Sequence, residues 1–64
     1  MPNIRSARLV DGIFRRSNLH GTKLTGANLT GANLTGADLT GADLRGADLT
    51  DAILDPDALA DAIT

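Results

Sequence analysis

The chain has 64 residues, a formal net charge of −2 at pH 7, no cysteine, no tryptophan or tyrosine, and one phenylalanine. This length allows one small domain, and the lack of cysteine excludes disulfides and thiolate metal sites. A single aromatic side chain and a weak net charge argue against nucleic-acid binding. No apolar run approaches the roughly 20 residues of a membrane-spanning helix, and the first residues lack the apolar stretch of a secretory signal. We therefore expect a cytoplasmic protein without membrane contact.

A five-residue unit repeats along most of the chain. Residues 21–50 read GTKLT, GANLT, GANLT, GADLT, GADLR and GADLT, and the same frame extends back to Ile4 and forward to Leu54. Eleven units therefore cover residues 2–56. A period of five fits neither the alternation of a strand nor the 3.6-residue turn of a helix. The pattern predicts a chain that turns a corner every five residues and points its large apolar residue, with the small residue two positions before it, toward a common axis.

These units resemble the A-(D/N)-L-x-x signature of the pentapeptide repeat proteins. The resemblance implies an all-β fold, a right-handed quadrilateral β-helix in which four pentapeptides form one square coil. Residues twenty apart then stack, as in the column Phe14–Leu34–Leu54, and the eleven units give just under three coils. Both ends of so short a coil present unpaired backbone groups and bare apolar layers. The first units depart from the signature, with Arg8, Ile13 and Lys23 where Asn or Asp is usual.

The last residues predict a short helix that caps the repeat domain. Asp55 is a suitable N-cap and Pro56 suits the first turn. Leu59 and Ile63 are four residues apart, so one helix face covers the last leucine layer. We therefore expect a repeat domain over residues 1–56 and a C-terminal α-helical cap over residues 57–64.

No constellation of residues predicts catalysis. Asp38, Asp43 and Asp48 fall on three successive faces of the predicted square, whereas acid–base catalysis by paired carboxylates needs two groups in one cleft. His20 is the only imidazole, so no metal site is expected. The sequence predicts a protein that is not an enzyme and uses no cofactor or metal.

Charge is divided along the chain. Residues 1–23 carry a balance of +4 and residues 24–64 a balance of −6. Because the chain advances along the coil axis, the two ends should carry opposite charge, which favours head-to-tail contact between copies. We therefore predict a non-enzymatic structural or interaction module that forms homo-oligomers through its coil ends. The predicted interaction surface consists of Arg5, Arg8, Val10, Ile13, Arg15, Arg16, Ile53, Leu59 and Ile63.

The alternative is a binding or inhibitor protein of a larger partner. In its sharpest form, which the family resemblance suggests, such a protein imitates duplex DNA and interacts with gyrase. A mimic needs an acidic ladder with about one charge per 1.7 Å of its length. The predicted outward columns, such as Arg8–Asn28–Asp48, contain no such ladder.

Overall fold

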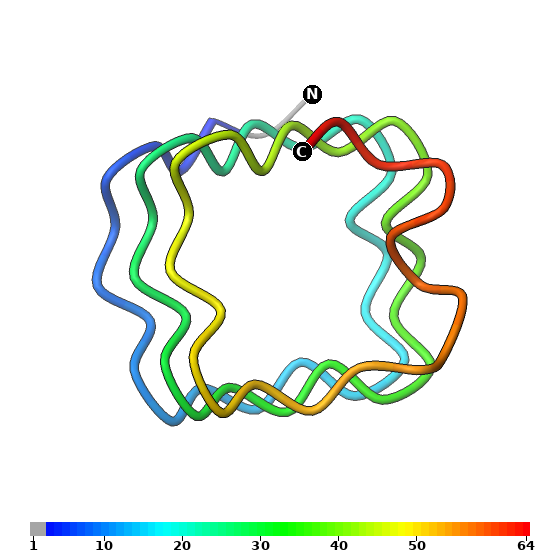
Figure 1. Ribbon diagram of the computed structural model, residues 1–64, viewed down its shortest axis with the longest axis horizontal. Coiled ribbons are helices and arrows are strands. Elements are labelled where there is room, and N and C mark those ends of the chain that lie inside the picture. The colour runs from blue at the N-terminus through cyan, green and yellow to red at the C-terminus, as the bar shows by residue number, and fades with distance from the viewer. Residues whose placement is uncertain (1–2) are drawn as a thin grey trace.

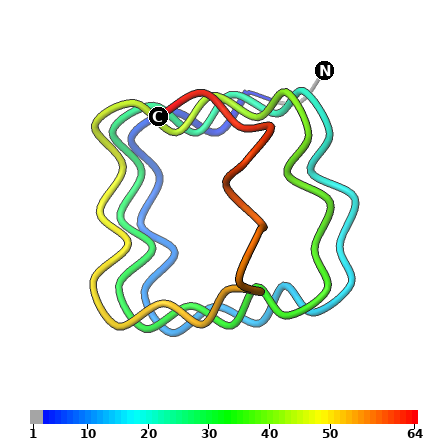
Figure 2. The same cartoon turned by 45° about the vertical axis from the view of Figure 1, so that its right-hand side comes forward.

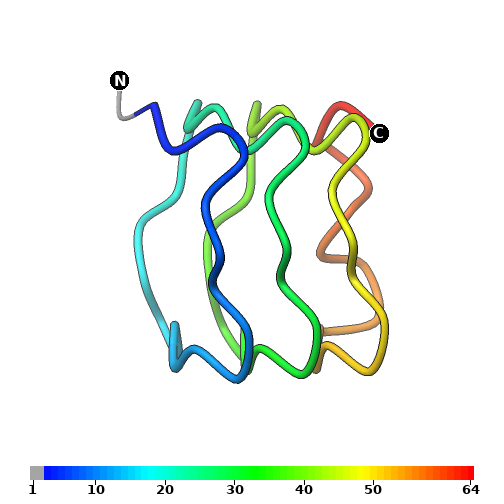
Figure 3. The same cartoon turned by 90° about the vertical axis from the view of Figure 1, so that its left-hand side faces the viewer.

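The computed structural model describes residues 3–64, which form a square coil. Met1 and Pro2, which begin the predicted repeat domain, lie outside the described residues. The view in Figure 1 looks nearly along the coil axis and shows the four sides, and Figure 3 shows successive coils side by side. Within residues 3–64 there is no helix, and pairing between coils occurs at single residues rather than in long strands. The Cα trace measures 21 × 20 × 17 Å.

Parallel β-bridges hold each coil to the next. The leucine N–H of one coil donates to the coil above, as from Leu24 to the Asp43 carbonyl at 2.8 Å, and the residue before a leucine donates to the coil below, as from Asn28 to Ala7 at 2.8 Å. Every bridge joins residues twenty apart, which confirms the predicted stacking. The bridges are Asn3–Lys23, Arg8–Asn28, Ile13–Asn33, Asn18–Asp38, Lys23–Asp43, Asn28–Asp48, Asn33–Ile53 and Asp43–Ile63.

The corner of each unit is a turn that explains the repeated glycine. The Ala27 N–H donates to the Leu24 carbonyl at 3.0 Å across Thr25 and Gly26, and Gly26 has a φ of 69°. A four-residue turn with positive φ only at its third residue is type II, which glycine favours because it has no Cβ. At the less regular corners Ser6, Asp11, Arg16 and Asp51 adopt φ of 58–60°.

In the units where Asn or Asp precedes the leucine, its side chain closes a second turn outside the square. The Oδ1 atom of Asn33 accepts the Thr35 N–H at 3.1 Å and the Thr35 hydroxyl at 2.6 Å, and Asp48 accepts from Thr50 at 3.0 and 2.6 Å. A short side chain that bonds the backbone two residues later is an Asx turn. The repeated Asn/Asp-Leu-Thr triplet is therefore a local hydrogen-bonding unit.

These turns predict loss of stability in acid. Hydrogen bonds from the side chains of Thr40, Arg45 and Thr50 lower the pKa of Asp38, Asp43 and Asp48 respectively. A carboxylate whose folded pKa lies below the unfolded value of about 3.9 stabilises the fold above that pH. Its contribution disappears as the pH falls through the folded pKa values. We expect the thermal midpoint to fall below about pH 4.

Replacement of all three aspartates by asparagine is the matched test of this acid dependence. Asparagine already makes the same contact at Asn28 and Asn33, whose Oδ1 atoms accept from Thr30 and Thr35. The triple variant should therefore lose less of its thermal midpoint between pH 5 and pH 2.5 than the parent chain, as followed by circular dichroism. Equal losses in the two proteins would show that the Asx turns do not cause the acid dependence.

The core is a stack of leucine layers lined by small residues. The middle layers are closed, with Leu24, Leu29 and Leu34 each 1% exposed and Ala27 and Ala32 fully buried. Ile4, Leu9, Phe14 and Leu49 are only partly buried and pack against that cluster from the two ends. The interior positions predicted from the repeat are therefore correct, and the terminal layers are the ones that remain open.

The predicted C-terminal helical cap is wrong. The Ala58, Ala60 and Ala62 N–H groups donate only to carbonyls three residues earlier, so residues 56–61 form separate turns instead of a helix. This segment continues the third coil along the fourth side of the square (orange in Figure 2). The chain then rejoins the ladder, where the N–H of Ile63 donates to the Ala42 carbonyl at 2.7 Å.

Pro56 accounts for the irregular path of this segment. Position 56 stands above Arg16 and Gly36, whose φ angles are 60° and 72°. Proline is locked near −65°, so the usual corner cannot form there. The carboxylate of Asp55 accepts the Gly36 N–H at 3.0 Å, where a backbone carbonyl serves at the regular corners. Leu59 still packs against the core, because burial of its side chain favours the coil over a marginal helix of about nine residues.

Candidate interaction surface

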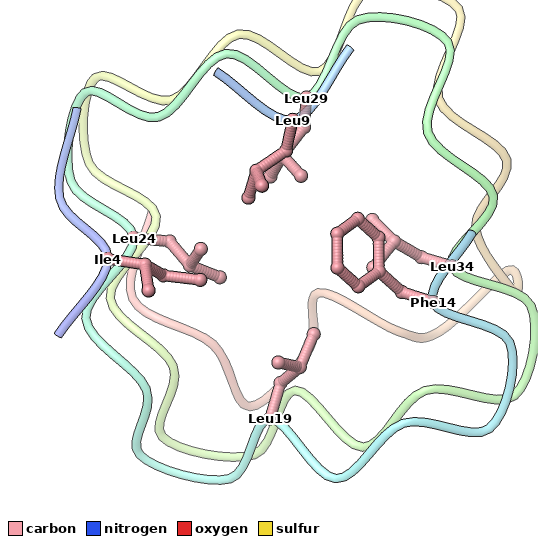
Figure 4. Close-up of a pocket in the computed structure, with 7 residues that line it drawn as sticks. All are labelled: Ile4, Leu9, Phe14, Leu19, Leu24, Leu29 and Leu34. Carbon is pink, nitrogen blue, oxygen red and sulfur yellow. The ribbon is translucent and has the colours of Figure 1, made fainter. Parts of the chain in front are cut away.

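An apolar hollow opens at the N-terminal end of the coil. Figure 4 shows Ile4, Leu9, Phe14 and Leu19 of the first coil pointing inward, next to Leu24, Leu29 and Leu34 of the second coil. These seven side chains line a shallow hollow with a cavity volume of about 10 Å³, part of which is open to solvent. Small-molecule pockets usually enclose about 300–1,000 Å³. The hollow therefore fits the tips of apolar side chains better than a ligand.

The C-terminal end presents a corresponding apolar layer. Leu49, Leu54 and Leu59 are each partly buried, and Leu44 in the same coil is 4% exposed. Leu59 keeps the twenty-residue interval from the buried Leu39, so it belongs to the core column. The predicted shared face of Leu59 and Ile63 is therefore wrong, because Leu59 turns inward while Ile63 lies outside at 47% exposure.

The two edges of the backbone ladder differ in polarity. The first coil has eight ladder carbonyl groups that accept no backbone hydrogen bond among residues 3–64, and the ladder N–H groups of Arg8, Ile13 and Asn18 there also lack a backbone partner. The last coil offers the N–H groups of Leu49, Asp51 and Leu54, which donate to no backbone acceptor in the described chain, beside the unpaired ladder carbonyls of Ala47 and Ala52. The eight carbonyls belong to Asn3, Arg5, Arg8, Val10, Ile13, Arg15, Asn18 and His20.

Charge follows the same division. The predicted cationic residues all lie exposed on the first coil, and the aspartates of the last coil are exposed on the opposite end of the molecule. The one ion pair found within residues 3–64 joins Arg45 to Asp43 at 2.7 Å and neutralises the only arginine of the acidic half. The cationic residues are Arg5, Arg8, Arg15 and Arg16, and the aspartates are Asp48, Asp51, Asp55, Asp57 and Asp61.

The predicted apolar surface residues do not form one patch. Ile13 and Ile53 share one column on either side of Asn33 and are 80% and 54% exposed. Val10, 44% exposed, lies at the corner just before Ile13, whereas Ile63 stands in the column of Asp43 on another side. Ile13 and Ile53 therefore share one side of the square, separated by Asn33, and Ile63 lies on another side.

The titratable side chains of residues 3–64 are spread over the sides of the square. No three metal-ligating side chains converge in this part of the chain. The same residues contain no helix that could span a membrane. Asp38 and Asp48 lie in different columns, paired with Asn18 and Asn28, which agrees with their predicted separation.

Sequence reasoning missed two parts of this surface. The first is the continuation of the coil to Ile63, for which the twenty-residue interval between Leu39 and Leu59 was an available signal. The second is the opposite hydrogen-bonding polarity of the two edges. That polarity depends on which backbone atom points along the axis at each position, and no residue pattern reveals it.

Comparison with known proteins agrees with this geometry. The family description "Pentapeptide repeats" matches residues 13–51 in 8 copies. A crystal structure of a pentapeptide repeat protein, Rfr23 from the cyanobacterium Cyanothece 51142, is 33% identical with a TM-score of 0.81, over 95% of this chain and 39% of its own. A pentapeptide repeat protein from the thylakoid lumen of Arabidopsis thaliana is 33% identical over 80% of this chain and 42% of its own, with a TM-score of 0.32. No curated protein matches the chain.

The chain thus spans less than half the length of these solved proteins. The match to Rfr23 covers nearly all of the square coil. The chain therefore has the right-handed β-helical fold of the pentapeptide repeat proteins. A family of repeat structures of this kind fits a structural or interaction role. With most of its residues inside the family match, the chain belongs to the pentapeptide repeat family.

Proposed function

We propose that this protein is a non-enzymatic interaction module that self-associates head to tail. The observation that carries the proposal is the complementarity of its two ends. The N-terminal end has an apolar hollow, exposed arginines and an excess of carbonyl acceptors. The C-terminal end has a partly exposed leucine layer, exposed aspartates and unpaired N–H donors.

Head-to-head contact is the poorer arrangement of two copies. It would bring Arg5, Arg8 and Arg16 of both chains together and would set carbonyl groups against carbonyl groups. Like charges at an interface repel, and unpaired backbone groups cost free energy when they are buried. A head-to-tail contact pairs opposite charges and pairs donors with acceptors. Because that contact is heterologous, it leaves one free end on each side and can repeat.

Light scattering across protein concentration and salt tests the proposal. We expect the molar mass to rise with concentration at low salt and to rise less at high salt, because ions screen the contact between the oppositely charged ends. A molar mass that stays at one chain throughout would contradict self-association. A fixed dimer in either salt would contradict a head-to-tail contact, since only a closed interface stops at two copies.

The variant Arg16→Asp sharpens the test. Asp11 and Asp51 already hold nearly the same positive φ as Arg16, so the corner should tolerate aspartate while the charge of the N-terminal end is reversed. We expect the dissociation constant to rise roughly threefold to tenfold at low salt. The double variant Asn28→Asp/Asn33→Asp is the matched control, because it also changes the net charge by −2, but midway along the axis and at positions where other units carry Asp. An equal rise of the dissociation constant in both proteins would show that net charge, and not the charge of the N-terminal end, weakens the association.

Binding to a larger partner by DNA mimicry is the second candidate. It rests on the acidic half of the chain, where Asp38, Asp43 and Asp48 lie before successive leucines. These side chains lie in different columns, so they do not align along the axis as phosphates do. A gyrase supercoiling assay tests this candidate, and unchanged supercoiling at high micromolar protein would eliminate it.

A further inference from the structure

We infer that a second copy continues the coil in one register, with its Asn3 above Asp48 and its Arg8 above Ile53. This inference rests on the head-to-tail association proposed above. The ladder positions of the described chain advance by five residues from Asn3 to Ile53, Ala58 forms no bridge, and Ile63 resumes the series above Asp43. The next vacant position in that series is therefore the one above Asp48.

Other rotations of the second copy fit less well. If it is turned back by one side, its first residues occupy the place that Ile63 already fills above Asp43. If it is turned forward by one side, the ladder groups of Ala47 and Leu49 stay uncovered. Only the inferred register neither overlaps the last residues nor leaves part of the exposed edge bare.

Backbone hydrogen bonds in this register repeat those inside the molecule. Inside the molecule, a leucine N–H donates to the carbonyl nineteen positions later, as from Leu29 to Asp48 at 2.8 Å. The N–H at a corner does the same, as from Gly31 to Thr50 at 2.8 Å. Across the seam, the N–H groups of Leu49, Asp51 and Leu54 meet carbonyls of the second copy. Those carbonyls belong to its Asn3, Arg5 and Arg8, which accept no backbone hydrogen bond within residues 3–64.

Side chains agree with the same register. Leu54 and Leu59 stand beneath Leu9 and Phe14 of the second copy, which line its hollow. Asp61 stands beneath Arg16 of the second copy, whereas the forward rotation would place it beneath Asp11. Burial of the apolar layer and attraction between opposite charges therefore favour the same rotation.

Disulfide trapping between single-cysteine variants tests the register. The chain has no cysteine of its own, so every cross-link comes from the introduced residues. Ile53→Cys is mixed in turn with Asn3→Cys, Arg8→Cys, Ile13→Cys or Asn18→Cys, which lie in the four ladder columns of the first coil. Stacked residues in neighbouring strands are about 4.8 Å apart, within the span of a disulfide, and residues on other sides lie beyond it.

In a glutathione redox buffer, the pair of Ile53→Cys and Arg8→Cys should give nearly all of the cross-linked dimer. A dominant product with Asn3→Cys, Ile13→Cys or Asn18→Cys would overturn the register while leaving head-to-tail association intact. No product from any pair, with a molar mass that still grows with concentration, would show that association uses another surface. No product and a constant monomer mass would overturn both the register and the proposed function.

Discussion

Leu34→Asp is expected to abolish the fold. Leu34 lies in the middle coil, 1% exposed, between Phe14 below and Leu54 above. A carboxylate at this place would lose its hydration without a partner, a change that costs more than about 4 kcal/mol. The whole stability of a chain this short is on the order of 5 kcal/mol. Circular dichroism should show loss of the β-helical spectrum, and the cooperative thermal transition should disappear.

Asn33→Asp is the matched control for this prediction. It introduces the same residue one position earlier, where the Oδ1 atom accepts from the Thr35 N–H and hydroxyl. Aspartate makes the same two contacts at Asp48 with Thr50. We expect an unchanged spectrum and a change in stability within about 0.5 kcal/mol. If Leu34→Asp folded as well as Asn33→Asp, the assignment of inward and outward positions would be wrong.

Gly12→Ala is expected to destabilise the first coil by about 1–3 kcal/mol. Gly12 occupies the small interior position that holds alanine in most units, and its φ is not positive, so its backbone does not require glycine. A Cβ atom there would collide with Cε2 of Phe14 and lie 2.9 Å from Cζ. In a chain of this size the loss corresponds to a fall in the thermal midpoint of roughly 5–20 °C.

The second substitution Phe14→Leu should restore most of that stability. The double variant carries alanine two positions before leucine, as Ala27 and Leu29 do in the buried second coil. Thermal unfolding of the parent, both single variants and the double variant gives a coupling energy, which we expect between about 0.5 and 3 kcal/mol. Additive effects would show that the glycine does not make room for the ring.

The register of the coil could be predicted from the repeat together with the family resemblance. Leucine at every fifth position and glycine between the units predict a corner every five residues, and the resemblance to the pentapeptide repeat proteins implies four units per coil, so that units stack at intervals of twenty. The bridges from Asn3–Lys23 to Asn33–Ile53 follow that interval. Local chemistry enforces it in each unit through the glycine turn and the Asx turn. A five-residue pattern can specify this fold because the same glycine turn and Asx turn recur from unit to unit.

The candidate surface could be predicted only in part. The division of charge between the halves of the chain is a property of the sequence, and the structure turns it into a division between two ends. The grouping of Ile13 with Ile53 also follows from the twenty-residue interval. The hollow beneath Phe14 and the polarity of the ladder edges depend on side-chain depth and carbonyl direction, which the repeat does not encode.

Residues 55–64 show most clearly what tertiary structure decided. The residues by themselves determined a coil that turns every five residues with its leucines inside, the family resemblance made it square, and the local signals at Asp55 and Pro56 favoured a helix. In the folded chain, Leu59 lies above Leu39 and Ile63 pairs with Asp43, so the coil continues. The physical reason is that a helix of about nine residues gains little alone. The exposed end of the coil offers this segment both an apolar layer and unpaired backbone groups.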